Sequence, residues 1–97
     1  MRRDEVLKAL EKHRKDVCAR FGVRSLRLFG SVARDEAAED SDVDILVDFT
    51  EPPTFRGYMD LRIFLEDLLG VKVDLITETG LRERVRPYVE KDAIRVA

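Results

Sequence analysis

The 97-residue chain contains neither asparagine nor glutamine, and it has a single cysteine. The lone Cys18 excludes a disulfide framework and a metal site built from several cysteines. No apolar run approaches the roughly 20 residues that a membrane-spanning helix needs. The N-terminal segment lacks the apolar stretch and the small-residue cleavage site of a signal peptide. We therefore expect a cytoplasmic protein with no membrane contact and one reduced, packed thiol.

Length and charge indicate how many domains the chain forms and which ligands it is suited to bind. The length predicts one domain over residues 1–97, with room for a core but not for a second lobe that closes over a substrate. The net charge is −2, but residues 35–79 alone carry −10 while the segments on either side are basic. This balance argues against direct nucleic-acid binding. An acidic centre flanked by basic segments suits a cation site that faces an anionic ligand.

Hydrophobic periodicity predicts alternating helices and strands. We expect helices over 4–21, 31–37, 57–69 and 81–91, strands over 23–29, 43–49 and 71–76, and a short edge strand over 93–97. Asp4 is expected to cap the first helix, and Gly22 and Gly70 are expected to stop the first and third. The predicted fold class is α/β (α+β), a small mixed β-sheet with helices packed against it.

Two aspartates at the start of the 43–49 strand are candidate metal ligands. Asp42 and Asp44 are two residues apart, so their side chains leave the same face, with Cα atoms roughly 6.5 Å apart. Carboxylates at that spacing can converge on one ion, or on two ions about 3.5–4 Å apart. Asp74 projects opposite to its apolar neighbours and completes a three-carboxylate cluster if its strand pairs beside 43–49.

Such a cluster needs a partner, because two like charges 4 Å apart repel by about 4 kcal/mol at an effective dielectric of about 20. A divalent cation removes this repulsion, and one acid with a raised pKa also relieves it. The alternative is an acidic strand that faces solvent. Asp48 fits that alternative in part, because it shares the face but lies roughly 13 Å from Asp44. The spacing alone leaves both interpretations open.

Gly30 and Ser31 follow the 23–29 strand and open a helix. There, backbone N–H groups and a hydroxyl can approach a phosphate, but for the pair taken alone an ordinary tight turn with Ser31 as N-cap is the better explanation. Arg34 lies about one helical turn further on. It can face phosphates or pair with a nearby acid.

The combination is more specific than its parts. Gly-Ser-x-Ala-Arg at 30–34, then Ser-Asp-x-Asp at 41–44, then a lone Asp74 on a later strand resembles the minimal nucleotidyltransferases of the DNA polymerase β superfamily. The resemblance covers roughly residues 5–96. It implies the nucleotidyltransferase fold, a triphosphate bound by Gly30 and Ser31, and two divalent ions held by Asp42, Asp44 and Asp74. Asp74 is then also the candidate base, and Arg34 and Ser41 have supporting roles in nucleotide binding.

The resemblance also implies an activity and a partner. We expect a Mg²⁺-dependent enzyme, with Mn²⁺ as an alternative ion, that transfers AMP from ATP or another NTP to a hydroxyl. Short members of the family commonly act as antitoxins that adenylylate a tyrosine of a HEPN-type toxin. Two alternatives stay open, a small-molecule nucleotidyltransferase and an antitoxin that acts by binding without turnover. The sequence also leaves open a homo-oligomer.

Other polar and aromatic residues have simpler explanations. His13 lies in a polar gap of the first helix and is expected to be a surface or half-buried side chain. Packing explains Cys18 and Tyr58 better than chemistry does, and Tyr88 is undecided. The basic run of Arg82, Arg84 and Arg86 is expected to be a solvated helix face.

Overall fold

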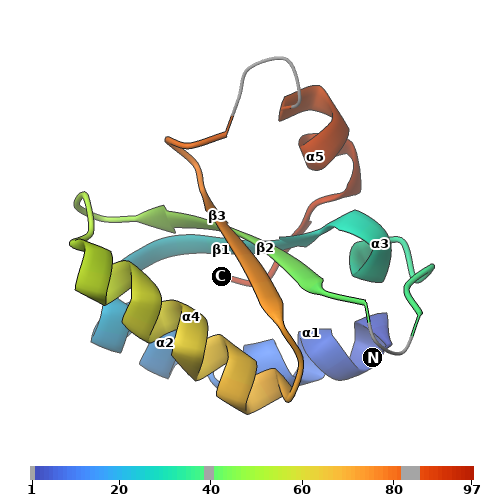
Figure 1. The fold of residues 1–97 in the computed structure, drawn as a ribbon, viewed down its shortest axis with the longest axis horizontal. Coiled ribbons are helices and arrows are strands. Elements are labelled where there is room, and N and C mark those ends of the chain that lie inside the picture. Colours follow the sequence, from blue (N-terminus) through green and yellow to red (C-terminus); the bar gives the residue numbers. More distant parts are fainter. Residues whose placement is uncertain (1, 39–40, 82–85) are drawn as a thin grey trace.

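The computed structural model describes residues 2–38, 41–81 and 86–97. Helices and strands alternate along the chain, as the periodicity predicts (Figure 1). Among the described residues, no helix is long and apolar enough to cross a membrane. The elements in chain order are α1 (Arg3–Lys12), α2 (Arg14–Phe21), β1 (Val23–Phe29), α3 (Gly30–Ala33), β2 (Val43–Phe49), α4 (Phe55–Leu69), β3 (Val73–Thr77), α5 (Arg86–Asp92) and β4 (Ile94–Arg95).

The four strands form one mixed sheet in the order β3-β2-β1-β4. Strand β1 is antiparallel to β2 and to β4, whereas β2 and β3 run parallel. The predicted small mixed sheet is confirmed, and so is the edge strand at the C-terminal end. Helices α1, α2 and α4 cover one face of the sheet, and α5 lies on the other (Figure 1).

Strand β2 separates two apolar clusters. Val43, Ile45 and Val47 are fully buried in the main core beneath the three long helices. Leu46 points the other way and packs with Phe29 and Leu81 in a smaller cluster. Because side chains alternate along a strand, Asp44 shares the face of Leu46 and projects away from the main core.

The predicted first helix is interrupted at His13, so the expectation of one continuous helix over 4–21 is wrong. α1 ends at Lys12 and α2 begins at Arg14, in the polar gap where no apolar side chain holds the helix to the core. The predicted cap is also wrong. Arg2 is the N-cap residue and makes no side-chain cap bond, while Asp4 lies in the first turn.

Two glycines end helices as expected, since Gly22 and Gly70 adopt φ values of 67° and 70°. α4 begins at Phe55, two residues before the predicted start, because the side chain of Thr54 accepts a hydrogen bond from the Gly57 N–H at 3.0 Å. Helix α3 ends at Ala33 rather than near residue 37. The described part of the last helix covers 86–92, and residues 82–85, including Arg82 and Arg84, lie outside the described residues.

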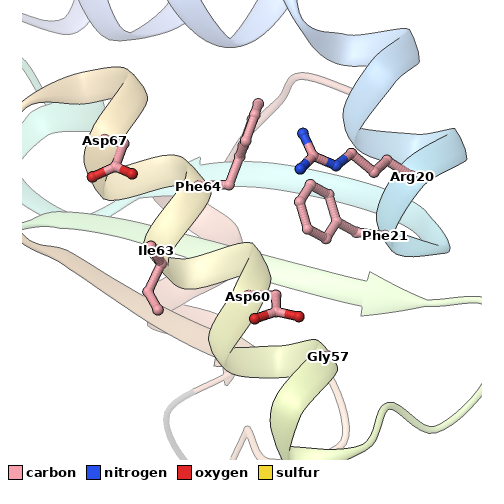
Figure 2. Close-up of a pocket in the computed structure, with 7 residues that line it drawn as sticks. All are labelled: Arg20, Phe21, Gly57, Asp60, Ile63, Phe64 and Asp67. Carbon is pink, nitrogen blue, oxygen red and sulfur yellow. The ribbon is translucent and has the colours of Figure 1, made fainter.

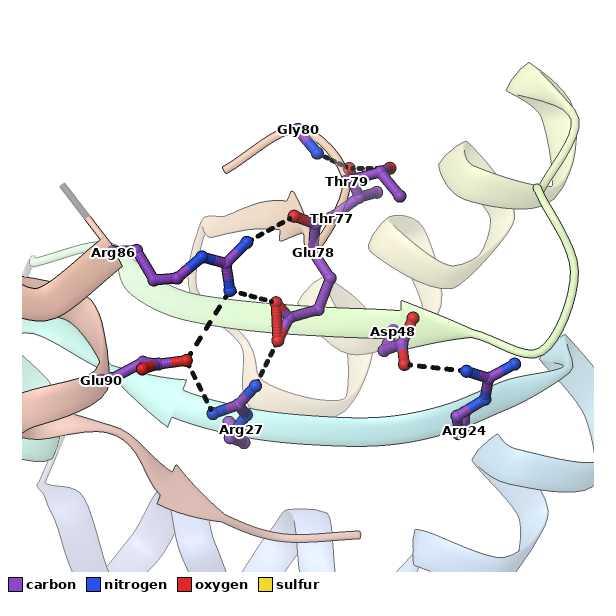
Figure 3. A network of polar contacts seen from close by, with 9 residues as sticks. All are labelled: Arg24, Arg27, Asp48, Thr77, Glu78, Thr79, Gly80, Arg86 and Glu90. Atoms are coloured by element: carbon purple, nitrogen blue, oxygen red, sulfur yellow. Dashed lines mark hydrogen bonds and ion pairs between the residues drawn. The ribbon is translucent and has the colours of Figure 1, made fainter. Parts of the chain in front are cut away.

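Helix α5 is tied to the sheet by ion pairs (Figure 3). Glu78, which follows β3, accepts hydrogen bonds from Arg27 of β1 and from Arg86 of α5, the latter at 3.1 Å. Glu90 lies 3.9 Å from Arg27 and 3.6 Å from Arg86. These contacts join two strands and α5 on the face that also carries Asp44.

Candidate functional site

Asp44 and Asp74 lie side by side on neighbouring parallel strands. The register pairs Asp44 of β2 directly with Asp74 of β3, and each is the second residue of its strand. Paired residues on adjacent strands are about 4.8 Å apart, so the two carboxylates lie next to each other at the N-terminal ends of β2 and β3. The requirement that the Asp74 strand pair beside 43–49 is therefore met.

Asp42 directly precedes β2 and is exposed. Its charge and that of Asp74 both act on Asp44, so the three predicted carboxylates are electrostatic neighbours. They do not form a preformed metal-binding site, because within the described ranges no three Asp, Glu, His or Cys side chains are arranged to hold a metal ion. The three-carboxylate cluster therefore stays a prediction.

Asp44 is the central acid of this group. The pKa of its carboxyl is raised from 3.8 to about 6, first by burial and then by the negative charges of Asp74 and Asp42 and a side-chain hydrogen bond with Asp74. The positive charge of Arg34 acts in the opposite sense and lowers that pKa. Such a perturbed carboxyl beside two like charges is typical of a functional site.

Gly30 lies directly against Asp44. A Cβ atom on Gly30 would be 2.1 Å from Asp44 Oδ2, and the backbone there has a φ of 76°. Both facts require glycine, since other residues rarely adopt this conformation and no carbon fits at that distance. The start of the Gly30–Ser31 motif and the Asp44 carboxylate are thus packed together, which the sequence order alone does not show.

Ser31 and Arg34 follow Gly30 in the chain and differ in exposure. Ser31 is half-buried in α3, and its carbonyl accepts a hydrogen bond from the Glu36 N–H at 2.9 Å. Arg34 Nη1 donates to Asp92 Oδ2 at 2.8 Å, and its Nε donates to Glu36 Oε2 at 3.2 Å. The guanidinium is therefore paired with acids, the second of the two possibilities that the sequence leaves open, and these bonds raise the Arg34 pKa above its ordinary value.

Ser41 has a local structural role. Its Oγ accepts a hydrogen bond from the Ala38 N–H at 3.0 Å, and its own N–H donates to the Ala38 carbonyl at 3.1 Å. These two bonds join Ser41 to Ala38 and so help to fix the residue that directly precedes Asp42.

Three further side chains are explained by packing. Tyr58 is half-buried and its hydroxyl donates to the Leu75 carbonyl. Cys18 is half-buried against the main core. His13 is half-buried and its ring meets that of Phe64 edge to face, with centroids 6.2 Å apart. The side chain of Tyr88 lies outside the described residues.

A separate hollow of about 580 Å³ lies between α2 and α4, on the helical side of the main core (Figure 2). The Arg20 guanidinium lies over the rings of Phe21 and Phe64, 5.2 and 5.5 Å from their centroids. None of the predicted site residues lines this hollow, and Asp44 projects from the opposite face of the sheet.

Asp44 and Asp74 fit a divalent ion that is also bound to a nucleotide. Mg²⁺ takes oxygen ligands, and proteins usually supply only one or two carboxylates while substrate phosphates supply the rest. Asp44 and Asp74 provide such a pair, and bringing the two charges together without a cation is unfavourable, as the raised pKa of Asp44 indicates.

Comparison with known proteins agrees with the geometry. A family model described as a nucleotidyltransferase domain matches residues 10–96. A relative from Thermococcus cleftensis, named protein adenylyltransferase MntA, is 43% identical over 93 residues, which are 96% of this chain and 94% of the relative.

Solved structures share the fold. One of a protein described as a minimal nucleotidyltransferase superposes with a TM-score of 0.81 at 47% identity, over 97% of this chain and 95% of that one. A complex of a tri-AMPylated HEPN toxin from Shewanella oneidensis with an MNT antitoxin contains a chain that matches with a TM-score of 0.68 at 17% identity, over 94% of this chain and 71% of that one. The second likeness concerns the fold alone.

Proposed function

Because the chain belongs to the nucleotidyltransferase domain family, we propose that it is a Mg²⁺-dependent enzyme that transfers AMP from ATP to a hydroxyl group. The observation that carries this proposal is that Asp44 pairs in register with Asp74 and also lies against the backbone of Gly30. It brings two acids from different strands to the motif that is expected to bind phosphates. The same observation favours a catalytic site over an acidic solvent-facing strand, because solvated acids need no such packing.

Each residue has a role in this reaction. Asp42, Asp44 and Asp74 would hold the divalent ions, which when bound would supply positive charge beside the leaving pyrophosphate. Gly30 lets the triphosphate approach the backbone, and Ser31 and Arg34 donate hydrogen bonds to it. Asp74, which is exposed, accepts the proton of the attacking hydroxyl. The rest of the catalytic effect would come from holding the acceptor oxygen in line with the leaving group.

We further propose that the acceptor is a tyrosine of a HEPN-type toxin and that the chain acts as its antitoxin in the cytoplasm. Two observations support this. The relative from Thermococcus cleftensis bears the name of a protein adenylyltransferase, and a chain of similar fold occurs in a complex with an AMPylated HEPN toxin. In addition, two of the three acids are exposed, so an acceptor carried on a second protein can reach the site.

The experiment is incubation of the protein with ATP, Mg²⁺ and the product of the neighbouring reading frame, read by intact mass. The expected result is a gain of one or more AMP groups on a tyrosine of that product. Asp42→Ala with Asp44→Ala should abolish it, while Asp48→Ala, on the same strand and paired with Arg24 at 3.6 Å, should not. Neutralisation of the partner without a mass gain would instead identify an antitoxin that acts by binding alone.

A further inference from the structure

Arg34 is held by an acid that the sequence alone does not single out. Its Nη1 bonds to Asp92, which lies 58 positions further along the chain at the end of α5. Only 21% of the Asp92 side chain is exposed, whereas the other partner of Arg34, Glu36, is 67% exposed. Asp92 is therefore the more enclosed of the two carboxylates that hold the guanidinium.

The position of Asp92 is set by the packing of α5. Val89 and Ala93, on either side of it in sequence, pack against the cluster of Phe29 and Leu46 on the site's face of the sheet. The ion pairs of Glu90 hold the same helix to the neighbouring strand β1. Glu36, by contrast, lies on an exposed connection after α3, so it is a less fixed partner.

A carboxylate at this end of a helix needs a cation beside it. The C-terminal end of a helix carries partial negative charge, which disfavours an acid there and favours Lys or Arg. The bond to Arg34 offsets this effect at Asp92. The backbone N–H of Arg34 also donates to the Gly30 carbonyl at 3.1 Å, which ties this residue to the Gly30–Ser31 motif.

We propose that Asp92 is a positioning residue that holds the Arg34 guanidinium beside the Gly30–Ser31 motif, where it bonds to the triphosphate of the bound nucleotide. This inference rests on the proposed function. Asp92 does not itself touch the nucleotide. A guanidinium presents its donors in a planar fork, so a carboxylate on one side orients the remaining N–H groups toward phosphate oxygens on another.

The test is calorimetric titration of the full chain with Mg²⁺ and AMP-PNP, which needs no acceptor protein. Asp92→Asn is expected to raise the dissociation constant roughly tenfold, and Asp92→Glu should recover part of the loss. Asp48→Asn is the matched control, because it also removes a carboxylate that pairs with an arginine, here Arg24 at 3.6 Å, but it lies outside α5 and does not contact Arg34. It should bind AMP-PNP as the wild type does.

A second comparison separates positioning from a general loss of structure. In an Arg34→Ala background, Asp92→Asn should cause no further loss of affinity, because the group it positions is gone. Unchanged or tighter binding by Asp92→Asn would overturn the inference, and so would an equal loss in Asp48→Asn. If the wild type binds Mg²⁺ and AMP-PNP but Asp92→Asn does so equally well, the proposed function survives and only this inference fails. Absence of binding by the wild type would overturn both.

Discussion

The Cα of Gly30 faces the carboxylate of Asp44 so closely that a Cβ atom would lie 2.1 Å from Asp44 Oδ2. Gly30 directly follows β1, and Phe29, the last residue of that strand, pairs with Asp44 on the antiparallel strand β2. The contact joins the expected phosphate-binding motif to the expected metal ligand. It therefore makes the geometry of each depend on the other.

Gly30→Ala is expected to abolish binding of Mg²⁺ and ATP, because the added carbon displaces the Asp44 carboxylate. It should also lower the free energy of unfolding by about 1–2 kcal/mol through backbone strain alone. Gly70→Ala is the matched control, since Gly70 has a φ of 70° but, apart from its own neighbours in the chain, no atom of the described residues lies within 4 Å of the position that a Cβ would take. It should show similar strain, measured by urea denaturation, and normal nucleotide binding. Loss of binding in both variants would contradict the role of the contact.

Asp44→Asn is expected to stabilise the metal-free protein at high pH. The pKa of Asp44 is about 6 in the folded protein and has an ordinary value of 3.8, so the folded state holds the extra proton more tightly. The stability from this proton is fully present below pH 3.8 and is lost as the pH rises through about 6. The variant avoids this loss, which amounts to up to about 3 kcal/mol and is reduced by solvent around the half-buried carboxyl.

The measurement is the melting temperature of both proteins between pH 4 and 8 in the presence of a chelator. The advantage of Asp44→Asn should appear near pH 5 and reach a plateau above pH 7. A difference that stays constant across the range would show that the Asp44 carboxyl is not perturbed. Asp48→Asn, which loses only the contact with Arg24, should not become more stable than the wild type at any pH.

Mg²⁺ together with ATP is expected to raise the melting temperature of the wild type. At a ligand concentration of 100 times the dissociation constant, binding adds about 2.7 kcal/mol to the stability of the folded state. The double variant Asp42→Ala with Asp44→Ala should show little shift in the same differential scanning measurement. An equal shift in both proteins would place the nucleotide elsewhere on the molecule.

Glu78→Gln is expected to loosen α5. Glu78 is 19% exposed and bonds to both Arg27 and Arg86 (Figure 3), so its loss leaves two half-buried cations with weaker partners. We expect a loss of about 1–2 kcal/mol in urea denaturation. The more exposed pair of Arg24 and Asp48 should contribute less than about 1 kcal/mol by the same measurement on Asp48→Asn. Equal losses would show that Glu78 has no special role.

Tyr58→Phe tests whether this tyrosine is structural. Its hydroxyl donates to the Leu75 carbonyl, so removal should lower the free energy of unfolding by about 1 kcal/mol. Binding of Mg²⁺ and AMP-PNP should stay unchanged, because the hydroxyl is bonded within the fold. Weaker nucleotide binding with unchanged stability would show instead that Tyr58 contacts the ligand.

Some features followed from local sequence. The strands Val23–Phe29 and Val43–Phe49 have the predicted bounds because their apolar side chains recur at the period of a strand. Gly22 ends α2 as expected because glycine tolerates positive φ. The sequence does not predict the break at His13, because the apolar residues on either side keep the helical period, while the interruption depends on how each half packs on the sheet.

The sequence by itself determined which residue types are available to the site and that Asp42 and Asp44 leave one face of a strand, since both depend only on order and backbone geometry. Only the tertiary structure decided that Asp74 is paired with Asp44, that Gly30 touches the same carboxylate and that Asp92 holds Arg34. The reason is that these contacts join residues from different elements. Their distances are set by strand register and helix packing, which no local pattern specifies.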